Sequence, residues 1–426
     1  MSEALHQRWS DQLAELELPP AAPWAEALRR AAADAFREAG LPHRKGEAWK
    51  YTPLAALEDP APGLSAGAPE HAPGAVDDTG PAMVFEGGRL GSTTGNLPGD
   101  LQWTALPEVL SEPDSAFREL LAELPGDGPA WAFSTLNTAL LAHGLAVHVG
   151  ENADAGRLRL VFRPGDAGRL ASTRLALLMA PGARLQLVVE HRGTDADVKG
   201  HLLNLVTQVR LGEGARLEVI ELQECPAGAS LVSRLHVGQG AGSRFVHVAL
   251  DAGGRLVRRD LQVRLEGEGA EVDLAGAAPA GDGQLLDHHV RVDHAAPGCR
   301  SDQLYRALAA GRSRAVFNGM AWVHPGADGT DARQSSKNLL LDRLAEIDAK
   351  PELEIHADDV VASHGATVGQ LDERALFYLR TRGLDEAQAR RMLVRAFCRP
   401  VIERVADPGL REWLDERLHA RLEALA

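Results

Sequence analysis

The feature that most restricts the fold of this chain is a loose repeat of about 30 residues in its central half, a period typical of repeat architectures. Glycine turns lead into short strand-like segments at Gly182, Gly214, Gly242 and Gly269, so the starts are almost evenly spaced. The segments alternate apolar and polar residues with a period of two, as strands do when successive side chains point to opposite faces. The stretch QVRLGEGARLEV, which begins at Gln208, also matches QVRLEGEGAEVD, which begins two repeats later at Gln262.

A repeat that holds only strands and turns excludes two large fold classes. It leaves no room for the crossover helices of a doubly wound sheet or of an eight-fold α/β barrel. A β-solenoid, an antiparallel sandwich built of hairpins and a propeller remain, although propeller blades usually repeat at about 40 residues. The pattern favours the solenoid only slightly, because a GEGA turn can also close a hairpin.

Segments with helical periodicity lie before and after this β region. Residues 1–145 are predicted to form a helical and irregular region, with two amphipathic helices before Gly40 and a Pro- and Gly-rich stretch over 57–129 that indicates loops and short strands. Residues 146–370 carry the strand pattern, and residues 371–426 are predicted to form a helical domain.

Two local signals support the helical assignment of the carboxy-terminal region. Gly383 is placed to end one helix, and Asp385 with Gln388 resembles a capping box that starts the next. The apolar stripe of that second helix is predicted to pack in the core and consists of Ala389, Met392, Leu393, Ala396 and Phe397, opposite a face of arginines at Arg390, Arg391, Arg395 and Arg399.

Charge and hydropathy limit the classes of partner that the chain can bind and indicate its compartment. The formal charge of −15 disfavours nucleic acid and anionic membranes as partners. The charged amino terminus does not resemble a signal peptide, and no stretch reaches the roughly 20 apolar residues of a membrane span. The three cysteines form no CxxC pair, which fits a reducing compartment. We therefore expect a cytoplasmic protein.

Motifs for common enzyme chemistry are missing from the sequence. It contains no phosphate-binding GxxxxGK[ST] loop, no GxSxG elbow and no HExxH pair. Its glycine-rich stretches precede strands and are interpreted as turns. An ATPase that acts with this chain would therefore be a separate protein.

Histidines supply the remaining candidates for chemistry. In DHHVRVDH, Asp287 and His289 can share a strand face while His288 points to the other, but an isolated pair of this kind is more often a surface feature than a metal site. The segment EIHADDV is interpreted as a strand with His356 and Asp358 on one face. His364 follows in a polar, glycine-bounded stretch, where its ring could order a turn or stay accessible as a ligand.

Several long motifs resemble one known family. The segment HADDVVASHGATVGQLDERALFYLRTRG and the DHHVRVDH region before it closely resemble the SufB/SufD family of iron–sulfur cluster assembly proteins. RKGEAWKYTPL and FSTLNTALLAHGLAVHV resemble the amino-terminal marks of its SufD branch. These motifs lie in the family's order along nearly the whole chain.

The resemblance implies a fold and a set of partners. It implies a right-handed parallel β-helix between amino- and carboxy-terminal helical regions. A SufD-type subunit is expected to pair with a SufB-type subunit through the β-helices and to dock a SufC-type ABC ATPase through its helical tail. A homodimer is a possible state of the isolated chain.

The resemblance also assigns a role to one histidine. The family's SHG histidine, implicated in forming the nascent cluster at the subunit interface, matches His364. Clusters normally require thiolate ligands, and no cysteine lies between Cys299 and Cys398. The thiolates of a transient, shared iron–sulfur cluster would then come from the partner. Cys225, Cys299 and Cys398 are interpreted as small buried apolar residues.

The expected function is thus that of a non-catalytic scaffold, with two alternatives. A SufB-type subunit that itself receives sulfur is disfavoured by the stretch without cysteine. A β-helix polysaccharide lyase or hydrolase would be secreted and would carry sugar-stacking aromatic residues, which make up only 4% of this chain.

Overall fold

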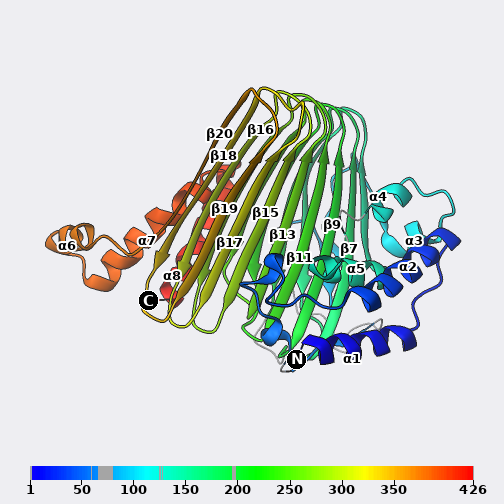
Figure 1. Ribbon diagram of the computed structural model, residues 1–426, viewed down its shortest axis with the longest axis horizontal. Helices are drawn as coiled ribbons and strands as arrows, with labels where there is room; N and C mark the ends of the chain where they lie inside the picture. Colours follow the sequence, from blue (N-terminus) through cyan, green and yellow to red (C-terminus); the bar gives the residue numbers. More distant parts are fainter. Residues whose placement is uncertain are drawn as a thin grey trace.

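The protein folds into a β-solenoid with a helical region at each end (Figure 1). We describe a computed structural model that covers residues 2–58, 60–65, 80–123, 126, 128–193 and 198–425. Each coil of the solenoid contributes one strand to each of two ten-stranded sheets. We call them the even sheet and the odd sheet after the numbers of their principal strands.

All principal strands run parallel to their neighbours in the same sheet. The even sheet contains β6 (Asp154–Arg163), β8 (Arg184–Arg192), β10 (Arg216–Glu224), β12 (Arg244–Asp251), β14 (Glu271–Ala280), β16 (Arg300–Ala309), β18 (Thr330–Leu340) and β20 (Val360–Gly369). The odd sheet contains β5 (Gly144–Val149), β7 (Arg169–Met179), β9 (His201–Leu211), β11 (Ala229–Gln239), β13 (Leu256–Leu265), β15 (Leu285–His294), β17 (Arg314–Val323) and β19 (Glu346–Ile355). Parallel pairing of this kind excludes the sandwich of hairpins.

The register explains the repeat in the sequence. Arg184, Arg216, Arg244 and Glu271 are successive pairing partners on β8, β10, β12 and β14, so the repeat length is one coil. The turn glycines Gly182, Gly214, Gly242 and Gly269 have φ between 59° and 70°. Other residues rarely adopt this left-handed conformation, which the tight turn between the two sheets requires.

The main core fills the space between the sheets. It consists of inward-facing side chains from both sheets, such as Leu217, Phe245, Val263 and Val292, and all four are almost completely buried. Alternation along each strand sends every second residue into this core.

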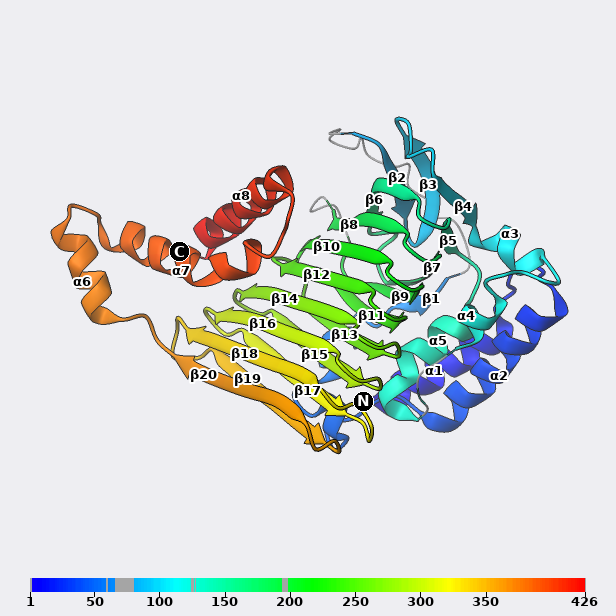
Figure 2. The same ribbon diagram turned by 90° about the horizontal axis from the view of Figure 1, so that it is seen from above.

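The amino-terminal helices cover the outer face of the odd sheet (Figure 2). Leu5 and Trp9 on α1 (Ser2–Glu15) and Phe36 on α2 (Pro23–Ala39) pack with Phe133 on α5 (Ala132–Ala139) against Leu170 and other outward residues of that sheet. Both helices predicted before Gly40 are present, and Gly40 has a φ of 76° at the end of the second.

The stretch over 57–129 contains more regular structure than its composition indicates. Its elements, with the neighbouring short helices, are η1 (Glu47–Trp49), η2 (Leu54–Leu57), β1 (Gly63–Leu64), β2 (Ala82–Glu86), β3 (Arg89–Thr94), β4 (Leu101–Ala105), α3 (Leu106–Ser111), α4 (Arg118–Ala122) and η3 (Pro129–Trp131). Strands β3 and β4 run antiparallel to β2 and β5 and close the first end of the solenoid. Part of the predicted loop region, residues 66–79, lies outside the described residues.

Three carboxy-terminal helices follow the solenoid, and the last two cover the outer face of the even sheet. They are α6 (Glu373–Thr381), α7 (Glu386–Ile402) and α8 (Pro408–Ala424), and Figure 2 shows α6 extending away from the solenoid. Gly383 has a φ of 94° after α6, and Asp385 and Gln388 form the predicted capping box of α7. In the described part of the chain, no helix has the length and apolar character needed to cross a membrane.

The predicted packing stripe of α7 needs correction. Met392 is 56% exposed, and Ala396 is exposed as well. Ala389 is buried as predicted, and Leu393 and Phe397 are partly buried. The other buried positions of the helix are Val394, Cys398, Val401 and Ile402. The helix is rotated from the predicted orientation because β14 and β16, which it packs against, determine the covered face.

Candidate functional site

The second end of the solenoid is formed by β19 and β20, the terminal strands of the odd and even sheets (Figure 1). Apolar side chains that the fold normally hides are exposed there. Val361 is 63% exposed, Val368 is 46% exposed, and Ile355 is 39% exposed. This end of the solenoid therefore presents an apolar surface over two unpaired sheet edges.

The two terminal strands differ in how they protect their edges. β19 carries Asp348, Lys350, Pro351 and further acidic residues, and charges and proline are the features that keep edge strands from pairing with another chain. β20, with the sequence VVASHGATVG, contains no proline and no acidic, lysine or arginine residue along its whole length. The edge of β20 is therefore the one suited to accept a further strand.

His364 lies in the middle of β20. Its pairing partner on β18 is Gln334, which is 4% exposed, and the next in the same register are Gln303 and Leu274. Paired residues of parallel strands direct their side chains to the same face, so His364 faces the same side as these interior residues. We call Leu274, Gln303, Gln334 and His364 the inner row. No coil follows β20, which leaves the imidazole exposed.

The inner row becomes polar toward the open end. Among the described residues, neither the amide nitrogen nor the amide oxygen of the Gln303 and Gln334 side chains has a hydrogen-bond partner. Unsatisfied buried amides are costly, and these two lie directly behind His364. The sequence reasoning missed both glutamines, because only the strand register places them next to this histidine.

His356 and Asp358 do not occupy the predicted strand. β19 ends at Ile355 and β20 begins at Val360, so both residues lie in the turn between them. His356 Nε2 is 2.9 Å from a carboxylate oxygen of Glu354. Across the described ranges, no three His, Cys, Asp or Glu side chains converge as a metal site.

The interpretation of the His288 and His289 pair as a surface feature is wrong. His288 points inward and its Nε2 lies 2.5 Å from Asp251, while His289 Nε2 lies 3.1 Å from Asp287. The predicted split of the two rings between strand faces is confirmed. Asp287 also accepts hydrogen bonds from Arg258 and Thr52 and so ties the amino-terminal WKYTPL segment to the odd sheet. Both imidazoles therefore have structural partners.

A buried ion network lies inside the solenoid, and no sequence motif indicates it. Arg259 donates to Asp251 at 2.8 Å and to Glu221. Burial alone would raise the pKa of each carboxyl group, but the Arg259 guanidinium and the histidines that contact the carboxylates together outweigh burial and hold both pKa values well below their usual range. The network thus keeps two anions in the core.

All three cysteines are buried, as predicted. Burial raises the pKa of Cys225 and of Cys398 to about 12, and it also raises the pKa of Cys299. A thiol with such a pKa is a poor nucleophile and a poor metal ligand at neutral pH.

The helical arm, α6 with α7, forms a second exposed surface. Phe377 is 69% exposed, Tyr378 is 56% exposed, and Met392 lies on α7 beside a cavity of about 510 Å³. Three residues of the arginine face, Arg391, Arg395 and Arg399, line the same cavity, where Arg395 is paired with Asp415. Exposed aromatic residues and methionine next to arginine are the usual components of a protein interface.

Comparisons with known proteins agree with these features. Residues 162–397 match the family model "SUF system FeS cluster assembly, SufBD core domain". The chain is 31% identical to the iron–sulfur cluster assembly protein SufD of Escherichia coli over 395 residues, or 90% of each chain. It is 30% identical to a SufBD family protein of Mycobacterium tuberculosis, covering 92% of this chain and 91% of the relative. A Synechocystis relative of the same family is 28% identical, with coverage of 88% and 86%.

Proposed function

The chain belongs to the SufBD family of iron–sulfur cluster assembly proteins, and we propose that it is the SufD-type, non-catalytic scaffold subunit of a cluster assembly complex. In this proposal the open end of the solenoid binds a SufB-type subunit, and the helical arm docks a SufC-type ATPase. The observation that carries the proposal is the unprotected edge of β20 with His364 at its centre.

The edge of β20 supports strand addition by the partner. Its unpaired backbone groups would continue the even sheet across the interface, and exposed Val361 and Val368 would supply the apolar contact. The same edge could pair with a second copy of this chain when the partner is absent.

His364 would then lie in the seam between the two subunits. A neutral imidazole is a suitable iron ligand, and the nascent cluster is the cargo of the site. The partner would provide the thiolates, because the three cysteines of this chain are buried with raised pKa values.

The role of His364 is tested by His364→Ala in the complete complex. We expect the complex to assemble normally, because the exposed ring has no hydrogen bond or ion pair within the described structure, while cluster formation in cells falls. His356→Ala is the matched control, since it removes an exposed imidazole from the same end of the solenoid. Full cluster assembly by the His364 variant would refute the assignment.

The two docking surfaces are tested by two variants, each designed to abolish binding of one partner and to leave binding of the other intact. Val361→Asp should abolish binding of the SufB-type subunit and preserve binding of the ATPase, and Phe377→Asp with Met392→Asp should do the reverse. Co-purification of the three chains is the measurement. Removing everything from Leu371 onward should also abolish ATPase binding, but it uncovers the apolar face of the even sheet, so the point variants are the cleaner test. Unchanged co-purification of either variant would contradict the corresponding interface.

A further inference from the structure

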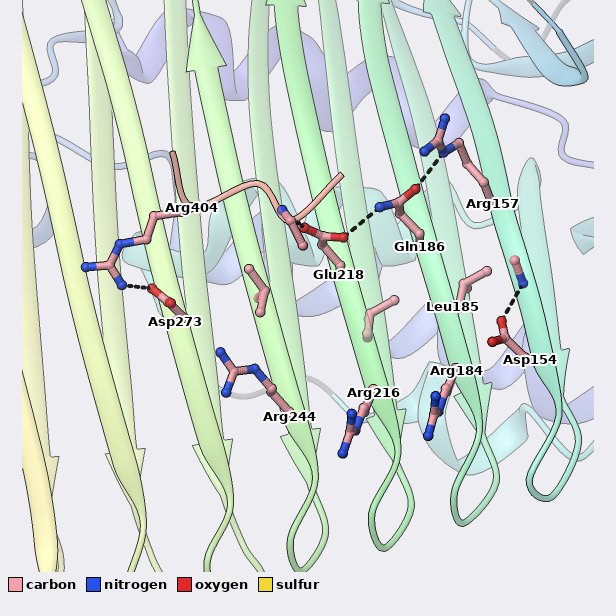
Figure 3. A pocket seen from close by; sticks show the side chains of 14 residues that line it. Asp154, Arg157, Arg184, Leu185, Gln186, Arg216, Glu218, Arg244, Asp273 and Arg404 are labelled. Carbon is pink, nitrogen blue, oxygen red and sulfur yellow. Dashed lines mark hydrogen bonds and ion pairs between the residues drawn. The ribbon is translucent and has the colours of Figure 1, made fainter. Parts of the chain in front are cut away.

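An arginine row lies on the outer face of the even sheet, away from both proposed interfaces. It consists of Arg184, Arg216 and Arg244, each of which follows a repeated glycine turn and pairs in register with the next (Figure 3). Neighbouring strands are about 4.8 Å apart, so the row brings three like charges together. Like charges directly opposite one another destabilise a sheet.

The rest of this register position shows how the fold otherwise avoids such repulsion. Beyond Arg244 the residues alternate in charge: Glu271, Arg300 and Asp331 follow on successive strands. Arg244 is paired with Glu271 at 2.7 Å, and Arg300 lies 3.6 Å from Asp331. The alternation is broken only where Arg184 and Arg216 stand next to Arg244.

Arg184 and Arg216 are not neutralised within the chain. In the described structure neither side chain makes a hydrogen bond or an ion pair, and both are exposed. The carboxylates that line the groove beside them have other partners. Asp154, which pairs in register with Arg184, accepts from the backbone nitrogen of Gly156 at 3.0 Å. Glu218 accepts from Gln186 at 2.6 Å and from the backbone nitrogen of Ala406 at 3.2 Å (Figure 3).

The arginine row forms one wall of a groove of about 570 Å³. The segment after α7 forms the opposite wall, where Arg404 is held by Asp273 at 2.6 Å. Five arginines and three acidic residues line the groove, so its lining carries a net charge of +2 in a chain with a formal charge of −15. Val246, which is partly exposed, adds apolar surface.

We propose that this groove binds a small molecule that carries two adjacent phosphate groups. The planar fork of each guanidinium matches a phosphate, and two free forks on neighbouring strands suit a pair of linked phosphates. The volume lies within the range of small-molecule sites, and the organic part of the ligand would contact Val246 and the aliphatic stems of the arginine side chains. Small-molecule sites are concave, and a groove with two walls has this shape.

The proposal is tested on the full-length chain by calorimetric titration with inorganic diphosphate. We expect saturable binding, with orthophosphate binding about tenfold or more weakly because it reaches only one guanidinium. The double variant Arg184→Gln with Arg216→Gln should weaken diphosphate binding by about tenfold or more, and the lysine double variant should retain part of it. The proposed function does not depend on this site, so cluster assembly is not the readout.

Arg300→Gln is the matched control, because it removes an arginine from the same register position outside the groove. It should bind diphosphate like the unmodified chain. The proposal is overturned if diphosphate does not saturate, if the glutamine double variant binds it equally well, or if Arg300→Gln loses as much affinity. Tighter binding of polyglutamate than of diphosphate would also overturn it and would point to an acidic protein partner.

Discussion

The buried network of Arg259, Asp251 and Glu221 predicts a change in the pH dependence of stability when the arginine is removed. Arg259→Leu keeps an apolar side chain in the core but leaves the two carboxylates with histidines as their only partners, His288 at Asp251 and His191 with His247 at Glu221. Asp251 is fully buried and Glu221 is only 8% exposed, so water cannot replace the guanidinium. Truncating one partner of a buried ion pair typically costs about 3 to 5 kcal/mol.

Protonation of the carboxyl groups sets an independent upper limit on the cost of removing the guanidinium. A buried carboxyl group that has lost its guanidinium can become neutral, and at pH 7 this costs about 4 kcal/mol, since its unfolded pKa is near 4 and each pKa unit is about 1.4 kcal/mol. At pH 5 the same cost is only about 1 to 1.5 kcal/mol for each group. The destabilisation caused by Arg259→Leu should therefore shrink by several kcal/mol as the pH falls from 7 to 5.

In the unmodified protein, the stability contributed by this network changes with pH in the opposite direction. Both carboxyl pKa values are lowered by folding, so their contribution is present above about pH 4 and is lost as the pH falls toward the folded values. Urea unfolding followed by circular dichroism at pH 5, 6 and 7 measures both trends. Arg264→Leu is the control, because it lies on the same strand with a side chain 44% exposed. A loss below about 1 kcal/mol at pH 7, or a loss that does not change with pH, would refute the reasoning.

Two further predictions concern the turns and the thiols. Gly214→Val should lower stability by about 1 to 2 kcal/mol, measured as a shift in thermal midpoint. Because φ is +64° there and nothing lies within 4 Å of the added carbon, the cost is one of backbone conformation alone. An unchanged midpoint would contradict this account of the turn. Cys225 and Cys398, with pKa values near 12, should resist iodoacetamide at pH 8 in the native protein and react after unfolding. Alkylation is measured by mass spectrometry. Rapid alkylation of either thiol in the native protein would contradict this prediction, because it would show that the thiol is accessible.

The sequence predicts this fold well where local pattern and long-range register coincide. The spacing of Gly182, Gly214, Gly242 and Gly269 predicts the coil length directly, because a left-handed glycine lies in each of these four returns. Helix signals such as the Asp385 capping box are equally local, and the structure confirms them.

The sequence does not predict the environment of a side chain whose contacts come from a distant coil. The partners of His288 and Arg259 on β15 and β13 lie on other strands of the solenoid, so their burial could not be inferred from neighbours in the chain. For the same reason Gln334 could not be connected with His364, which lies a full coil further along the sequence but only one strand away in space. The rotation of α7 that exposes Met392 likewise depends on the sheet beneath the helix.

The difference between the two ends of the solenoid argues that the open end is a functional interface. At the first end, antiparallel strands β3 and β4 terminate both sheets. At the second end the chain turns away into α6 and leaves β20 uncovered, although a long strand without proline or charged protectors invites aggregation. The adjoining β19 carries Lys350 and Pro351, so this protein does protect an edge when it is to remain free. In the proposed complex the partner subunit would cover β20.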